Sequence, residues 1–258
     1  MKILFIGNSF GDDACAHLYG ILSSLGDRDA VAANLYIGGC SLARHAENVL
    51  SGAPAYEYRK ITSGGLNNRP ETSAVYALTD EHWDVVSLQQ CSGLSGIAGS
   101  YNGDIDVILS AVRAHASDAK IYWHMTWAYD DKSGHPEFYR YGNSRKQMFA
   151  DITAAVSAVV APDVRFSGII PSGTAVENAR EAGLSGLTRD GFHLSFGLGR
   201  YIAALCCAEA LTGQTEKSRY SPKDYPVDSY ERAVALSCVK AALKNPFSVS
   251  RALETPTL

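Results

Sequence analysis

Several features that would direct a chain to a particular partner or compartment are missing from these 258 residues. No apolar run reaches the roughly 18 residues that a membrane-spanning helix needs, and residues 1–6 are too short for the apolar core of a signal peptide. The formal net charge is −4, and no basic stripe offers a surface to nucleic acid or an anionic membrane. We expect a cytoplasmic protein as the chain stands, with no nucleic-acid or membrane partner. A leader removed from a longer precursor stays an open alternative.

The short motifs of metal and phosphate sites are missing as well. The six cysteines include no Cys-x-x-Cys pair, and no His-x-x-x-His or His–carboxylate cluster accompanies them. Neither Gly-x-Gly-x-x-Gly nor Gly-Lys-Ser/Thr occurs. The sequence therefore predicts no metal, no cofactor and no disulfide framework.

What the sequence does contain is a regular alternation of short β-type runs and longer helical patterns. Apolar residues make up 46% of the chain, which is ample for a buried core. We predict strands at residues 3–6, 30–37, 83–88, 120–123 and 164–170, with amphipathic helices between them. The polar segment 51–69 is interpreted as an excursion over the rim of the sheet.

This alternation predicts right-handed βαβ units in one α/β domain over residues 1–258, with a parallel sheet of about five strands and helices on both faces. Ligands of such sheets bind at the carboxyl ends of the strands. The segments expected to meet there are residues 7–11, 38–42, 89–93 and 125–129.

Two segments carry residue types that suit nucleophilic catalysis. Ser9 lies in Gly-Asn-Ser-Phe-Gly, between the first strand and the first helix, where backbone N–H groups of the helix start lie beside its hydroxyl. The alternative is that Ser9 or Asp12 only caps the helix. Asp190 precedes His193 by three residues, a spacing at which a carboxylate can hold an imidazole in one tautomer. The alternative there is a turn aspartate beside an ordinary loop histidine.

Together the two segments resemble the SGNH or GDSL-type hydrolase superfamily, in the order of that family and over nearly the whole chain. The resemblance is closest to uncharacterised bacterial SGNH proteins that are similar to carbohydrate acetylesterases. It implies a flavodoxin-like three-layer sandwich, with Ser9 as nucleophile, His193 as general base and Asp190 as the residue that orients the base.

The same resemblance suggests donors for the oxyanion, with one departure from the family pattern. Gly-Gly-Cys-Ser at 38–41 is similar to the Gly-Gly-x-Ser segment of carbohydrate acetylesterases, and Gly39 is the expected backbone donor, with Ser41 or Leu42 as alternatives. The family's usual Asn after the third strand is replaced by Gln89-Gln90. We expect the Gln90 amide to substitute for it. The alternative is that Gln90 satisfies backbone groups at the strand end. The neighbouring Gln89 is the control, because strand alternation points its side chain the other way.

Trp127 lies in an aromatic segment after the fourth strand and is the expected platform for a sugar ring, the alternative being core packing. The sequence thus predicts a serine esterase that removes O-acyl groups, in particular O-acetyl groups, from a small-molecule or oligosaccharide ester. A short-chain lipid esterase or thioesterase, and a catalytically silent carbohydrate-binding relative, stay as alternatives.

Overall fold

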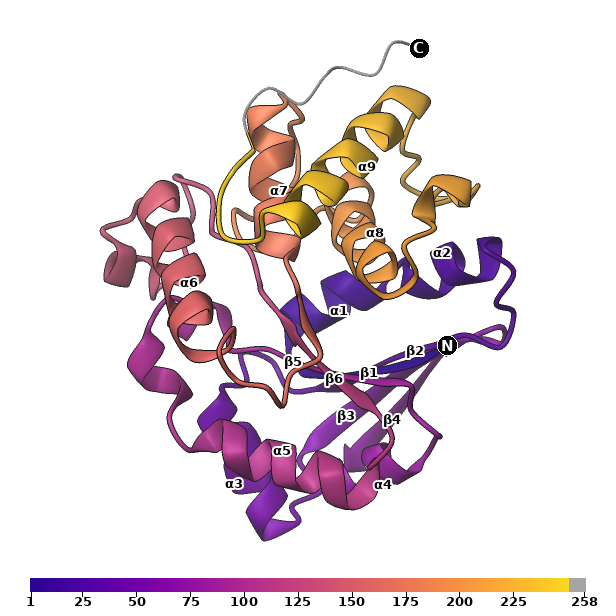
Figure 1. The fold of residues 1–258 in the computed structure, drawn as a ribbon, viewed down its shortest axis with the longest axis vertical. Helices are drawn as coiled ribbons and strands as arrows, with labels where there is room; N and C mark the ends of the chain where they lie inside the picture. Colours follow the sequence, from indigo (N-terminus) through magenta and orange to yellow (C-terminus); the bar gives the residue numbers. More distant parts are fainter. Residues whose placement is uncertain (251–258) are drawn as a thin grey trace.

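The computed structural model describes residues 1–250; residues 251–258, which the domain prediction includes, lie outside the described part. Strands and helices alternate along the chain (Figure 1). The strands are β1 Lys2–Gly7, β2 Val31–Tyr36, β3 Tyr56–Thr62, β4 Gly65–Thr72, β5 Val85–Leu88, β6 Lys120–His124 and β7 Gly168–Ile170. The α-helices are α1 Ser9–Cys15, α2 Leu18–Ser24, α3 Leu42–Ser51, α4 Ala74–Thr79, α5 Asp104–His115, α6 Arg145–Val159, α7 Ser172–Glu181, α8 Leu198–Thr212 and α9 Ser229–Lys244. Short 3₁₀ turns lie at η1 Ser92–Leu94, η2 Ala98–Tyr101, η3 Phe138–Tyr141 and η4 Thr215–Lys217.

All strands belong to one sheet in the order β4-β3-β2-β1-β5-β6-β7. The five predicted strands are the ones that pair in parallel, in the spatial order β2-β1-β5-β6-β7. Renumbered among themselves, they run 2-1-3-4-5, which is the flavodoxin-like order. The α/β class is confirmed, but the prediction of about five strands is wrong because the sheet has seven and is partly antiparallel.

The two extra strands form the antiparallel hairpin β3–β4, which occupies much of the segment that was interpreted as an excursion. Every residue of β4 except Thr72 is exposed, because this strand is the edge of the sheet. An uncovered edge hairpin carries polar side chains, so its hydropathy is that of a loop. Backbone pairing of β3 with β2 and of β4 with β3, rather than burial, makes this segment a pair of strands.

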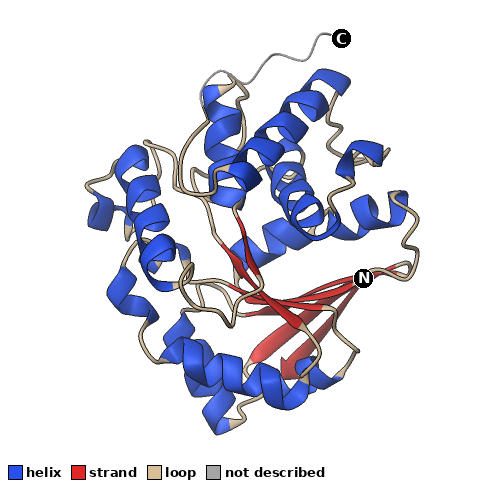
Figure 2. Cartoon of the chain, viewed as in Figure 1, coloured by secondary structure: helices blue, strands red, loops and turns tan. Residues whose placement is uncertain are grey.

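Helices cover the parallel part of the sheet on both faces (Figures 1 and 2). On one side α3, α4 and α5 contact one another, and on the other α1, α2, α7, α8 and α9 form a larger layer. Ile3, Leu4 and Phe5 in β1 are fully buried between these layers, as expected for a strand enclosed on both faces. In the described residues no helix is long and apolar enough to cross a membrane.

The carboxyl ends of the central strands meet at one edge of the sheet. Gly7 in β1 pairs with Tyr36 in β2, and Leu88 in β5 pairs with Trp123 in β6. The loops that follow these four strands therefore leave the sheet side by side. They are the segments in which the sequence placed its candidate site.

Candidate active site

Ser9 is the first residue of α1, directly after β1 and the single linking residue Asn8. Asn8 is the N-cap, because its side-chain oxygen accepts a hydrogen bond from the Phe10 N–H at 3.0 Å. The alternative that Ser9 or Asp12 caps this helix is therefore wrong. With the cap supplied by its neighbour, the Ser9 hydroxyl is available for another partner.

That partner is His193, and the three predicted side chains form one hydrogen-bonded line. Ser9 Oγ lies 2.9 Å from His193 Nε2, and His193 Nδ1 lies 2.7 Å from Asp190 Oδ2. A carboxylate only accepts hydrogen bonds, so Nδ1 carries the proton of the neutral imidazole and Nε2 is free to accept from the hydroxyl. This is the arrangement that deprotonation of a serine requires.

The loop that carries Asp190 and His193 turns tightly on itself. Gly191 adopts φ +88°, a conformation that favours glycine. The turn lets Asp190 Oδ1 accept from the backbone N–H of His193 at 2.7 Å and of Phe192 at 3.1 Å. Burial by itself would raise the pKa of Asp190, but the hydrogen bonds from His193 and from these backbone groups outweigh burial and lower the pKa. Asp190 is thus a carboxylate at neutral pH.

Asn8, beside Ser9, is held by a buried chain of polar side chains. Gln89 Nε2 donates to Asn8 Oδ1 at 2.9 Å, and Gln89 Oε1 lies 3.0 Å from His124 Nδ1. His124 Nε2 in turn lies 3.0 Å from the Ser172 hydroxyl. Burial lowers the pKa of His124 to about 3, so this histidine is a neutral link in the chain at physiological pH.

The structure gives Gln90 a different set of partners from the one expected. Its side-chain oxygen accepts from the backbone N–H of Leu42 at 3.0 Å and of Cys91 at 2.8 Å. Its amide nitrogen donates to the carbonyl and the hydroxyl of Ser100 at 2.9 and 3.0 Å. The expectation that Gln90 offers a free amide to an oxyanion is therefore wrong, and Gln90 satisfies backbone groups. Sequence reasoning treated Gln89 only as a control, although strand alternation already separated the two side chains.

Gly39 lies in an exposed turn after β2, with φ +62°. The Cys40 carbonyl in this turn accepts from Asn8 Nδ2 at 3.1 Å, which ties the turn to the residue before Ser9. Within residues 1–250 the Gly39 N–H has no protein acceptor. The Leu42 N–H, an alternative donor, is already bonded to Gln90.

Trp127 is fully buried, so the expectation of a sugar platform at this residue is wrong. Its ring stacks on Phe10 with centroids 4.3 Å apart, and its Nε1–H donates to the Phe192 carbonyl at 2.8 Å. The indole therefore braces the loop of His193 against the helix of Ser9. Trp127 therefore packs in the core, which was the alternative for this residue.

His135 belongs to the surroundings of the hydrogen-bonded triad of Ser9, His193 and Asp190. Its ring lies 4.6 Å from that of Tyr129 and 4.8 Å from that of Phe192, measured between centroids. Burial, with a further contribution from the nearby His193, lowers the pKa of His135. No sequence motif marks this residue, because the loop of residues 130–137 reaches the triad only in the folded chain.

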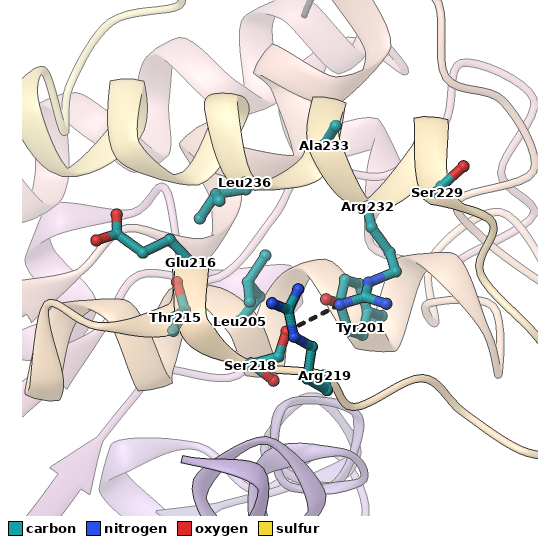
Figure 3. A pocket seen from close by; sticks show the side chains of 10 residues that line it. All are labelled: Tyr201, Leu205, Thr215, Glu216, Ser218, Arg219, Ser229, Arg232, Ala233 and Leu236. Carbon is teal, nitrogen blue, oxygen red and sulfur yellow. Dashed lines mark hydrogen bonds between the residues drawn. The ribbon is translucent and has the colours of Figure 1, made fainter. Parts of the chain in front are cut away.

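A separate cavity of about 260 Å³ lies between α8, η4 and α9 (Figure 3). Arg219 and Arg232 point into it, and Arg232 Nη2 donates to the Ser218 carbonyl at 2.9 Å. None of the triad residues lines this cavity. In the described part of the chain no group of three or more His, Cys, Asp or Glu side chains could hold a metal ion.

Comparisons with known proteins agree with this architecture. The family described as "Domain of unknown function (DUF4886)" matches residues 2–242. A DUF4886 family protein from Bacteroides uniformis is 35% identical, with 99% of each chain covered and a TM-score of 0.92. No curated protein matches the chain.

More distant solved structures share the fold. A carbohydrate esterase family 3 protein from Talaromyces cellulolyticus is 15% identical over 84% of this chain and 98% of its own, with a TM-score of 0.52. TesA is 14% identical over 83% of this chain and 99% of its own, with a TM-score of 0.51. The resemblance to SGNH and GDSL-type hydrolases is thus confirmed at the level of the fold.

Proposed function

This chain belongs to the DUF4886 family, and from its SGNH-type fold and its site we propose that it is a serine hydrolase of carboxylic esters. The observation that carries the proposal is the line of contacts from Ser9 through His193 to Asp190, with separations of 2.9 and 2.7 Å. A nucleophile, a base and a group that orients the base are all in hydrogen-bond contact.

The reaction follows from the proton positions. His193 Nε2 takes the hydroxyl proton as Ser9 Oγ attacks the ester carbonyl, and Asp190 stabilises the imidazolium that forms. His193 then gives this proton to the departing alcohol, leaving an acyl-serine. A water molecule, deprotonated by the same nitrogen, attacks the acyl carbon; the carboxylic acid leaves and Ser9 regains its proton.

The negative charge of each tetrahedral intermediate needs hydrogen-bond donors. We assign this role to the backbone N–H groups of Ser9 and Gly39. The support for Gly39 is its position in the turn tied to Asn8 and its N–H without a protein acceptor in residues 1–250. Donors fixed in the backbone need no reorganisation as the charge develops.

For the substrate we propose an O-acetyl ester on a carbohydrate. The support is the Gly-Gly-Cys-Ser segment at 38–41, similar to that of carbohydrate acetylesterases, together with the fold shared with a carbohydrate esterase family 3 protein. The fold shared with a putative GDSL-like lipase from Parabacteroides merdae, at a TM-score of 0.51, keeps a short-chain lipid esterase or thioesterase as the second candidate. Acetate release from a panel of acetylated glycans, compared with p-nitrophenyl esters of increasing acyl length, separates the two. A preference for acetyl supports the first, and a rate that rises with chain length supports the second.

Replacing the nucleophile tests the proposal directly. Ser9→Ala should lower kcat on p-nitrophenyl acetate by about 10⁴-fold or more, because the acyl-serine can no longer form. It should also abolish covalent labelling by a fluorophosphonate. The melting temperature should change by only a few degrees, since Asn8 supplies the helix cap.

Ser110→Ala is the matched control, because this exposed hydroxyl on α5 bonds only to the Asp106 carbonyl within its own helix. It should keep wild-type turnover and labelling. Wild-type turnover in Ser9→Ala would exclude the acyl-serine route. A wild-type enzyme that is neither labelled nor active would favour the silent carbohydrate-binding relative.

A further inference from the structure

Asp13 is a fully buried carboxylate on α1 that the proposed reaction does not use. It lies one helical turn beyond Ser9, and three donors converge on it. The backbone N–H of Leu194 donates to Oδ2 at 2.8 Å, while Arg189 Nη1 and Arg200 Nε donate to Oδ1 at 3.0 and 2.7 Å. A carboxylate without solvent is retained only where such donors replace its hydration.

Two of these donors flank the pair on which the reaction depends. Arg189 directly precedes Asp190, and Leu194 directly follows His193. The loop is also closed on itself, because the Arg189 N–H donates to the His193 carbonyl at 2.9 Å and the Arg189 guanidinium to the Leu194 carbonyl. Asp13 therefore holds both ends of the four-residue segment 190–193 against the helix that begins with Ser9.

The third donor to Asp13, Arg200, belongs to α8 and so connects that helix to the same carboxylate. The guanidinium groups of Arg189 and Arg200 lie 4.8 and 4.7 Å from the centre of the Phe196 ring. Both cations therefore contact the same ring as well as the same carboxylate. The nucleophile helix, the His193 loop and α8 thus share one buried carboxylate.

We propose that Asp13 is a positioning residue that sets the separation between Ser9 Oγ and His193 Nε2, an inference that rests on the proposed function. Ser9 and His193 lie 184 residues apart, so the loop of His193 must be anchored to α1 by something outside the reacting groups. A displacement of about 1 Å between reacting groups costs about 10²-fold in rate. Loss of the Asp13 contacts should therefore affect kcat rather than substrate binding.

The test replaces Asp13 by Asn, which keeps the shape of the side chain but removes its charge. We expect kcat on p-nitrophenyl acetate to fall by about 10²-fold with KM changed by less than about threefold, measured where the variant is fully folded. Arg200→Gln removes one donor and leaves the other two, and should lower kcat in the same direction by about tenfold. This second variant keeps the test valid if Asp13→Asn does not fold.

Asp80→Asn is the matched control. This carboxylate accepts from Tyr58 at 2.9 Å and from Lys60 at 2.7 Å, close to the amino end of β5, at the edge of the sheet opposite the triad. It should lose stability without a selective loss of kcat. A kcat loss in Asp13→Asn no larger than in Asp80→Asn, at equal folded fraction, would overturn the assignment.

A second readout does not depend on turnover. The His193 Nδ1 proton, bonded to Asp190, is followed by proton NMR in the wild type, Asp13→Asn and Asp80→Asn. We expect its resonance to shift or broaden only in Asp13→Asn, and an unchanged resonance there would overturn the positioning role. If the wild type hydrolyses no ester, the proposed function fails, while this measurement still decides whether Asp13 positions His193.

Discussion

At the scale of single residues, two adjacent glutamines leave the end of β5 in opposite directions and serve different neighbours. Gln89 belongs to the hydrogen-bonded chain from His124 to Asn8, the residue beside Ser9. Gln90 joins the start of α3 to Ser100. Strand alternation separates their side chains, but the sequence could not say which of the two faces the site.

Alanine at Gln89 should therefore lower kcat, whereas alanine at Gln90 should lower stability. Gln89→Ala should lower kcat on an acetyl ester by about tenfold, because Asn8 loses the bond that orients it beside Ser9. Gln90→Ala should leave kcat nearly unchanged and lower the free energy of unfolding by about 1–3 kcal/mol, because buried backbone groups lose their partner. Steady-state kinetics and urea unfolding measure the two effects. A selective kcat loss in Gln90→Ala would restore Gln90 as an oxyanion donor.

At the scale of elements, α7 begins where the backbone of the loop after β6 passes close to it. A Cβ atom added at Gly173 would lie 2.1 Å from the Thr126 carbonyl oxygen. Gly173→Ala should therefore force the helix away from the loop and lower the free energy of unfolding by about 1–3 kcal/mol. Gly99→Ala is the control, since nothing lies within 4 Å of the added atom. Equal stabilities of the two variants in urea would contradict this account.

Hydrophobic periodicity predicts some of these strands and helices correctly and fails for others. The five parallel strands are apolar because helices cover both faces, and all five were predicted. The hairpin β3–β4 was missed because its edge strand is exposed along almost its whole length. Between the first two predicted strands the chain forms two helices, α1 and α2, that meet near His17. His17 Nε2 lies 2.8 Å from the Phe196 carbonyl, a contact that local spacing does not reveal.

At the scale of the whole molecule, stability should decrease in mild acid. Burial lowers the pKa of both His45 and His124 to about 3. Between the unfolded value of about 6.5 and a folded value of about 3, the unfolded chain binds protons that the folded chain does not. Each histidine then removes up to about 1.4 kcal/mol per pH unit as the pH falls through this interval.

Urea unfolding at intervals from pH 4 to pH 8 measures this slope. His45→Gln should reduce the slope, since glutamine does not titrate. His82→Gln is the control, because the His82 side chain is 79% exposed, and it should leave the slope unchanged. Equal slopes in His45→Gln and the wild type would contradict the assignment of His45 as a buried neutral group.

The sequence by itself determined the parallel core of the sheet, the edge of the sheet at which the candidate site lies, and the candidate residues Ser9, Asp190 and His193. These depend on local patterns, namely hydrophobic periodicity and short motifs at strand ends. Only the tertiary structure decided that Trp127 is buried, that Gln89 rather than Gln90 supports Asn8, and that Asp13 holds the His193 loop. Each of these depends on a partner distant in the chain, as the separation of 181 positions between Asp13 and Leu194 illustrates. Local spacing carries no information about such partners, because folding alone brings them into contact.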